Sequence, residues 1–156
     1  MRNVINSIKN DADFNSFPLD NPIDLLDNYG RTPVHYICKY LFYNDADCNS
    51  SKLLSYVLQN GYYTVGDIDI GSVSALYILI ESAFERLPRN PVNNKMVVEM
   101  INILINYGAN PNCVHNNYAT PYSKSVEYYG RGAKFFDGIV DLLKNNGGSF
   151  EYIKNL

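Results

Sequence analysis

The fold of this chain is decided by the stretch Asp27-Asn28-Tyr29-Gly30-Arg31-Thr32-Pro33-Val34-His35. Thr32 stands where a helix needs an N-cap, because a threonine oxygen accepts a hydrogen bond from an otherwise unpaired backbone N–H group. Pro33 follows at the first helical position, where its missing N–H costs nothing and its fixed φ suits a helix. Gly30 supplies a tight turn before the cap. The stretch therefore predicts a turn that leads directly into a helix.

A second stretch repeats these features further along the chain. It runs Leu104-Ile105-Asn106-Tyr107-Gly108-Ala109-Asn110-Pro111-Asn112 and leads to Ala119-Thr120-Pro121-Tyr122. Thr120 and Pro121 take the places of Thr32 and Pro33, so they predict another helix start. Gly108 follows an apolar helical run, and a glycine in the left-handed conformation ends many helices. The second stretch therefore predicts the end of one helix and the start of another.

Together the two stretches resemble ankyrin repeats, whose opening carries a Thr-Pro-Leu-His signature. The resemblance implies an all-α solenoid of about three helix-pair repeats with divergent N- and C-terminal caps. In the middle repeat Ser74-Ala75-Leu76-Tyr77 stands in the place of the signature, without its proline and histidine. In the family the signature histidine is a structural hydrogen-bonder, so the same role is expected of His35.

The spacing of the repeats departs from the family's pattern. From Thr32 to Ser74 is 42 residues and from Ser74 to Thr120 is 46 residues, whereas the usual period is about 33. The excess falls in two polar segments, residues 44–49 and 88–94. We expect both to be lengthened loops between the two helices of a repeat, because loops tolerate insertion at small entropic cost.

We expect one domain, residues 1–156, built from consecutive repeats. Its parts are an N-terminal cap or degenerate repeat at 1–26, repeats at 27–68, 69–114 and 115–148, and a C-terminal cap at 149–156. The helices of the repeats are predicted at 33–42 and 51–59, from Ser74 to 87 and at 95–107, and after Thr120 and at 134–145. Gly130-Arg131-Gly132 is predicted to be the turn between the last two helices.

The charge and hydropathy patterns argue against nucleic-acid and membrane partners. The formal net charge is -3 and the Lys and Arg residues are scattered, whereas phosphate binding needs them clustered. No stretch approaches the ~20 apolar residues of a membrane span, and the N-terminus lacks the apolar stretch of a signal peptide. We therefore expect a cytoplasmic protein, or one that acts in a host cytoplasm if it is a pathogen effector.

The three cysteines, Cys38, Cys48 and Cys113, are irregularly spaced along the chain. This pattern fits neither a disulfide framework nor a metal site. We expect reduced thiols, at least one of them buried, since free cysteine is among the most buried residue types. No metal and no other cofactor is expected.

The resemblance also implies the function, which is binding another protein through the turns and the outward faces of the first helices. Tyr and Arg, which recur here, are enriched at energetically important interface positions. The expected protein-binding face comprises Asn28, Tyr29, Arg31, Lys39 and Tyr40 in the first repeat, Ile70, Val73 and Glu81 in the second, and Asn116, Asn117, Ala119, Glu127 and Tyr128 in the third. Of the pair Tyr128-Tyr129, one ring is expected to project outward.

On this reading the chain is a monomer that occludes or sequesters its partner. It would act as an inhibitor, as an immunity or antitoxin-like protein, or as a host-directed effector. Two other functions stay open. Divergent caps that pack end to end would make a structural, self-associating scaffold. His35 and Cys38 lie three residues apart on a predicted helix and would share a face, so a hydrolase-type enzyme is a remote alternative. No local nucleophile signature accompanies them, and we expect the chain not to be an enzyme.

Overall fold

The computed structural model describes residues 28–40, 50–59, 66, 72–86, 94–115 and 118–151. These residues form six helices and no strand, so the described chain is all-α as predicted. The helices are α2 (Pro33–Tyr40), α3 (Ser50–Gln59), α4 (Ala75–Arg86), α5 (Asn94–Asn106), α6 (Pro121–Gly130) and α7 (Phe136–Asn145).

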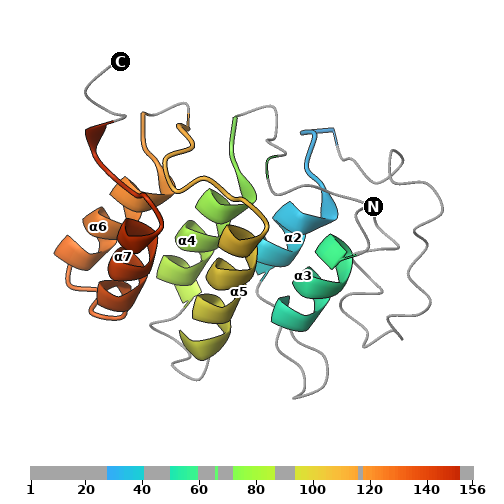
Figure 1. Cartoon of the computed structure of the whole chain (residues 1–156), viewed down its shortest axis with the longest axis horizontal. Helices are drawn as coiled ribbons and strands as arrows, with labels where there is room; N and C mark the ends of the chain where they lie inside the picture. Colours follow the sequence, from blue (N-terminus) through green and yellow to red (C-terminus); the bar gives the residue numbers. More distant parts are fainter. Residues whose placement is uncertain are drawn as a thin grey trace.

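The helices lie in two layers, and Figure 1 shows the layers one behind the other. In one layer α2 packs against α4 and α4 packs against α6; in the other layer α3 packs against α5. The layers are joined because α2 contacts α3, α4 contacts α5 and α6 contacts α7. Three successive helix pairs therefore stack side by side, and the first helix of every pair lies on the same side of the stack.

The predicted helix boundaries agree with the observed ones to within two residues wherever the structure describes them. The largest difference is at α7, which begins at Phe136 rather than at residue 134. Where the chain enters α7, the Asp137 N–H donates to the carbonyl of Lys134, three residues earlier, at 3.1 Å. This is the tighter spacing of a 3₁₀ turn. The predicted cap at 1–26, the loop at 44–49 and almost all of the loop at 88–94 lie outside the described residues.

Each first helix is entered through a residue with a left-handed backbone. Gly30, Ser72 and Tyr118 have φ values of 70°, 58° and 58°, and each lies two residues before the cap position of its helix. The predicted turn at Gly30 is therefore confirmed, and the same turn recurs at two positions that are not glycine. A non-glycine residue in this conformation costs about 1–2 kcal/mol, so the stack keeps this entry geometry even where the residue type opposes it.

The three cap positions satisfy the helix starts with different side chains. Thr120 forms a capping box, in which Ser123 N–H donates to Thr120 Oγ1 (3.0 Å) and Thr120 N–H donates to Ser123 Oγ (2.8 Å). Ser74 accepts from the Tyr77 N–H on its Oγ, 3.3 Å. The predicted cap at Thr120 is confirmed, and Ser74 caps its helix as well.

Thr32 differs from the prediction that its hydroxyl caps a backbone N–H. Its Oγ1 lies 2.9 Å from His35 Nδ1, and its own N–H donates to the same nitrogen at 3.2 Å. The reason is His35, three positions later. Its imidazole ring lies back against Thr32, and its Nδ1 accepts from both the N–H and the hydroxyl of that residue. Since Nδ1 accepts these bonds, the ring proton resides on Nε2.

The third residue after the cap also links one helix pair to the next. His35 Nε2 donates to the Val73 carbonyl at 3.1 Å, joining α2 to the segment that enters α4. Tyr77, three residues after its own cap, stacks on His115 in the segment that leads to α6, with ring centroids 4.7 Å apart. His35 is thus a structural hydrogen-bonder, as expected.

Three helices end in the same glycine motif. At the end of α5 the Gly108 N–H donates to the Ile105 carbonyl and the Ala109 N–H to the Leu104 carbonyl, both at 2.9 Å. This is a Schellman arrangement, which requires a left-handed residue, and Gly108 has a φ of 93°. Gly132 after α6 and Gly147 after α7 repeat it. The predicted helix end at Gly108 and the predicted turn around Gly132 are confirmed.

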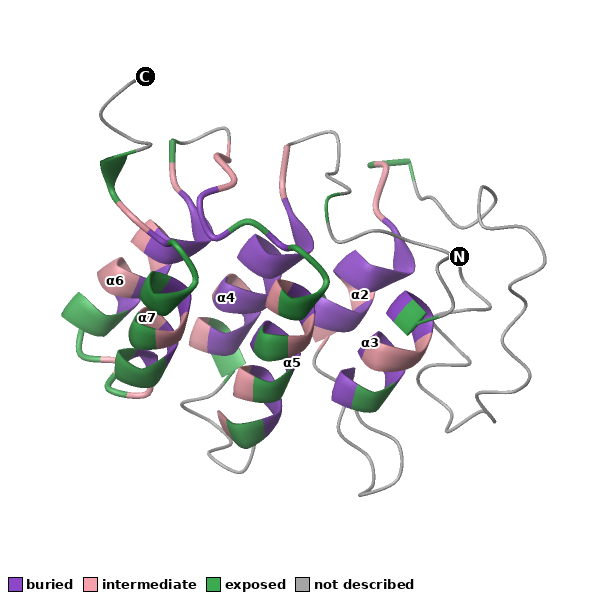
Figure 2. Cartoon of the chain, in the orientation of Figure 1, coloured by how far each residue is buried: buried purple, intermediate pink, exposed green. Residues whose placement is uncertain are grey.

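The core is centred on α4, which lies between α2 and α6. Eight of its residues are buried and they fall on all sides of the helix, and Figure 2 shows most of α4 in the buried colour, with an exposed C-terminal end. The helices α3, α5 and α7 each keep an exposed side in the same view. A stack of helix pairs requires both kinds of helix. The central helix is covered on both sides, and the amphipathic helices are covered on one side.

We predict that Gly148→Ala destabilises the fold, whereas Gly138→Ala stabilises it. A Cβ atom at position 148 would lie 2.7 Å from Tyr122 Cδ2 and 2.9 Å from the Leu143 carbonyl oxygen, and relieving such overlap costs about 1–3 kcal/mol. At Gly138, inside α7, the added methyl group meets nothing within 4 Å, and alanine is favoured in a helix by about 1 kcal/mol. Thermal unfolding measures both changes. A Gly148→Ala protein that melts at the wild-type temperature would contradict this packing.

We also predict that His35→Leu lowers the free energy of unfolding by about 1–3 kcal/mol, because the buried Thr32 N–H loses its acceptor and the link to the Val73 carbonyl is removed. Urea denaturation measures the loss. Thr32→Val should cost less in the His35→Leu background than in the wild type, since the hydroxyl has then already lost the ring. Losses that simply add would show that Thr32 and His35 do not act as a unit.

Candidate functional site

A hollow of about 390 Å³ runs between α2 and α4 on the side of the stack where the first helices lie. We call it the groove. It is lined by Arg31, Lys39, Val73, Ile78, Glu81, Ser82, Glu85, Arg86 and His115. Arg31, Lys39, Val73 and Glu81 belong to the predicted binding face, so the structure brings residues from two helix pairs of that face together around one cavity.

One face of α4 supplies most of the lining. Its five contributing residues, from Ile78 to Arg86, recur at spacings of three and four, which places them on one side of a helix. These positions recur with the period of a buried helix face, but most of them carry polar side chains. Ile78 and Ser82 are buried and form the floor, whereas Glu85 and Arg86 are exposed at the rim.

The α2 side of the groove is basic and aromatic. Lys39 is exposed, and its Nζ lies 5.9 Å from the centroid of the Tyr40 ring. Arg86 reaches across from α4, donates to the Tyr40 carbonyl oxygen and also lies over the Tyr40 ring. Tyr40 in turn stacks on Tyr36, with centroids 5.9 Å apart. Tyr40, predicted as a binding residue, is therefore half-buried and joins the two walls.

Buried phenols lie beside the carboxylates of this face. Burial raises the pKa of Tyr77 above its ordinary range, and the charge of Glu81 together with a hydrogen bond to it adds to the shift. Burial also raises the pKa of Tyr128 to about 12, and Glu81 and Glu127 act in the same direction while Arg131 opposes them. Both phenols therefore stay neutral to a higher pH than a free tyrosine does.

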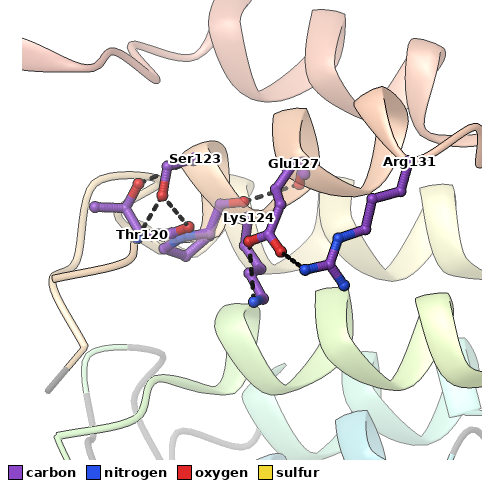
Figure 3. Close-up of polar contacts among 7 residues, drawn as sticks. Thr120, Ser123, Lys124, Glu127 and Arg131 are labelled. Carbon is purple, nitrogen blue, oxygen red and sulfur yellow. Dashed lines mark hydrogen bonds and ion pairs between the residues drawn. The ribbon is translucent and has the colours of Figure 1, made fainter. Parts of the chain in front are cut away.

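The third first helix, α6, carries its own compensated charges. Glu127 lies between Lys124, whose Nζ is 3.0 Å from Glu127 Oε2, and Arg131, which binds the other carboxylate oxygen. Figure 3 shows Glu127 between the two basic side chains, and the Thr120–Ser123 capping box at the start of the same helix. Glu127, predicted as a binding residue, is partly exposed but is paired within α6.

Tyr128 does not belong to an exposed face, which corrects the prediction. It is buried, and its ring stacks on Phe84 with centroids 3.8 Å apart and planes 2° apart. The ring that projects outward from the pair is Tyr129, which is 45% exposed. Position 128 faces α4 because α6 packs against α4 along that side, so the neighbouring helix buries the ring.

The turns that enter the helices place two tyrosines at the surface. Tyr29 is 62% exposed and Tyr118 is 61% exposed, and Arg31 lies over the Tyr29 ring at 5.3 Å. Asn28 beside it is exposed. Ala119 is half-buried, and its carbonyl accepts from the His115 N–H at 2.8 Å. The predicted residues Ile70, Asn116 and Asn117 lie outside the described residues.

Several lining residues were missed by sequence reasoning. Ile78, Ser82 and Glu85 lie three or four residues from one another or from Glu81, so they share one face of the helix with it. Counting by three and four from Glu81 along the sequence would have found them. His115 comes from a turn, and only the folding of that turn brings it beside Tyr77. Its Nδ1 is buried and has no hydrogen-bond partner within the described part of the chain.

The pair His35 and Cys38 does not have the geometry of a nucleophile and a base. Cys38 is fully buried, and burial raises the pKa of its thiol far above the ordinary range. A thiol held in this way is inert, because the thiolate is the nucleophile. Both ring nitrogens of His35 are occupied by Thr32 and Val73. The two side chains thus serve the core.

Across residues 28–40, 50–59, 66, 72–86, 94–115 and 118–151, no group of three or more His, Cys, Asp and Glu side chains is placed to hold a metal ion. None of the helices in those ranges has the length and apolar character needed to span a membrane. Neither a protein-family model nor a curated protein matches the chain.

We predict that Tyr128→Phe protects the fold at alkaline pH. The folded-state pKa of about 12 lies above the ordinary phenol value of about 10. The stability that the neutral, buried phenol contributes is therefore complete below about pH 10 and is lost as the pH rises through about 12. Phenylalanine does not ionise, so the unfolding free energy of the variant should fall less between about pH 9 and about pH 12. Tyr129→Phe, at the exposed neighbour, is the matched control. Equal alkaline losses in wild type and Tyr128→Phe would contradict the prediction.

Proposed function

We propose that this chain is an ankyrin-repeat protein that binds another protein along the groove and thereby occludes or sequesters it. One observation carries the proposal. Arg31, Lys39, Val73 and Glu81 were expected on the binding face from their repeat positions alone, and they line one cavity. Interaction residues that repeat from helix pair to helix pair and meet on one surface are characteristic of solenoid binding proteins.

The register of the helix pairs supports the proposal. Lys39, Glu81 and Glu127 each lie seven residues after the cap position of their helix. The left-handed entry residue and the cap recur at matching positions too, and in the first two pairs the link to the next pair starts at the third residue after the cap. A recurring frame with side chains that vary at one surface position is how repeat proteins present a binding face.

The character of the groove favours a protein over a small molecule. Five of its nine lining residues are Lys, Arg or Glu, whereas small-molecule sites are concave and lined mainly by apolar side chains. The turns beside the first helices add the exposed rings of Tyr29 and Tyr118. Tyrosine and arginine are the residue types that contribute most at protein interfaces.

Occupation of a partner's surface is the mode of action we propose, as inhibitor, immunity protein or host-directed effector. In this proposal the free chain is a monomer in the cytoplasm, where it takes up one partner molecule. Neither nucleic acid nor membrane is part of the proposal, since the net charge is -3 and Lys and Arg form no run in the sequence.

The test is capture of the partner followed by mapping with variants. The tagged chain, Glu81→Lys and the control Lys144→Glu are used as baits in an extract of the cells in which the chain acts. Lys144 is exposed on α7 and is not part of the groove. We expect one protein at about 1:1 with wild type and with Lys144→Glu, and an affinity at least about tenfold weaker, or about 1.4 kcal/mol, with Glu81→Lys.

Binding is then measured with both purified proteins, and hydrogen exchange identifies the protected segments. Equal affinity of wild type and Glu81→Lys would show that the partner binds elsewhere than in the groove. Capture of nothing but a second copy of the chain, with a dimer in light scattering, would favour the self-associating scaffold instead.

A further inference from the structure

The groove carries opposite charges on its two walls. Lys39 on α2 and Glu81 on α4 occupy the same position of successive first helices, seven residues after the cap. α2 packs directly against α4, and packed helix axes lie about 8–10 Å apart. The two side chains therefore stand at the same level on either side of the hollow. They form no ion pair with each other, and Glu85 forms none with any described residue.

Each of these charges has an aromatic neighbour on its own helix. The Lys39 ammonium lies over the ring of Tyr40, the next residue on α2. The Glu81 carboxylate interacts with Tyr77 one turn earlier on α4, and the Tyr77 ring is fixed by its stacking on His115. Charges positioned before binding lose little freedom when a ligand arrives, which increases the share of the interaction that appears as affinity.

On the next first helix, α6, the equivalent charge is compensated by ion pairs. At the matching position of α6, Glu127 is paired with both Lys124 and Arg131. On α4 the basic residue beside Glu85 is Arg86, and it is directed to the carbonyl and ring of Tyr40. The charges available to a ligand thus concentrate between α2 and α4, with the positive charge on one wall and the negative charges on the other.

We propose that the groove takes an extended segment of the partner protein that places an acidic side chain against Lys39 and a basic side chain against Glu81 and Glu85. The axes of packed helices lie about 8–10 Å apart and an extended chain advances about 3.3 Å per residue, so a segment that crosses from α2 to α4 has about three residues between the two charges. The recognised feature is therefore one acidic and one basic side chain about three residues apart, in a fixed order along the segment. This inference rests on the proposed protein-binding function and names the chemistry of the bound segment.

The test selects short peptides from a random displayed library on the immobilised full chain. We expect the enriched peptides to carry Asp or Glu and Lys or Arg about three residues apart. Synthetic copies should bind at least about tenfold more weakly to Lys39→Glu and to Glu81→Lys. They should bind unchanged to the control variants Asp141→Lys and Lys144→Glu, whose residues are exposed on α7. Thermal melting of every variant confirms that it is folded.

The double variant Lys39→Glu/Glu81→Lys gives the sharpest outcome, because it exchanges the charges of the walls. It should lose the original peptides and bind copies in which the acidic and basic residues have changed places. Loss of all binding by the folded double variant would overturn the inference, because the groove would then not recognise the peptides by the order of their acidic and basic residues.

The outcomes also separate this inference from the proposed function. Enriched peptides that are neutral or apolar, yet compete with one another and protect the groove in hydrogen exchange, would overturn the charge pattern and leave protein binding intact. A folded wild type that enriches no peptide and captures no protein would contradict both. Enriched peptides with the expected charges, insensitive to Lys39→Glu, would remove Lys39 from the site and overturn the inference.

Discussion

His35 holds two helix pairs together at the point where both begin. Its Nδ1 accepts from Thr32 while its Nε2 donates to the Val73 carbonyl, so one buried ring joins the start of α2 to the entry of α4. A buried ring with a satisfied bond on each side fixes both segments, because leaving either partner unpaired costs more than the bond itself contributes. The joint therefore fixes where the entry segment of α4 lies relative to the start of α2, at one end of the contact between these two helices.

The joint recurs with different chemistry along the stack. Where the first pair uses a hydrogen-bonding histidine, the second uses Tyr77, whose ring stacks on His115. The left-handed entry at Gly30 recurs at Ser72 and Tyr118, although neither is glycine. What is kept is the left-handed entry and the position, three residues after the cap, from which the link starts, whereas the contact itself differs. As a result, a position counted from one cap lies level with the same position counted from the next cap.

This register brings side chains of separate helices together around the groove. The aromatic residues of the core also lie beside the charges of the groove, since Tyr77 interacts with Glu81, and Arg86 on α4 donates to the carbonyl oxygen of Tyr40. α6 neutralises its own carboxylate, whereas α2 and α4 leave opposite charges facing a hollow. The proposed recognition of a segment with both charges follows from that difference between otherwise equivalent helices.

The sequence by itself determined the all-α class, the places of the helices and the glycine that ends α5, because caps, helical period and left-handed turns are local properties of the chain. It also identified four groove residues through their repeat positions. Only the tertiary structure decided which faces are covered. Tyr128 is apolar enough to pack and polar enough to be exposed, and the approach of α4 buries it against Phe84. The Thr32 hydroxyl turned to His35, and His115 came beside Tyr77, for the same reason. Burial and long-range partners depend on how helices far apart in sequence pack, and no local pattern specifies that packing.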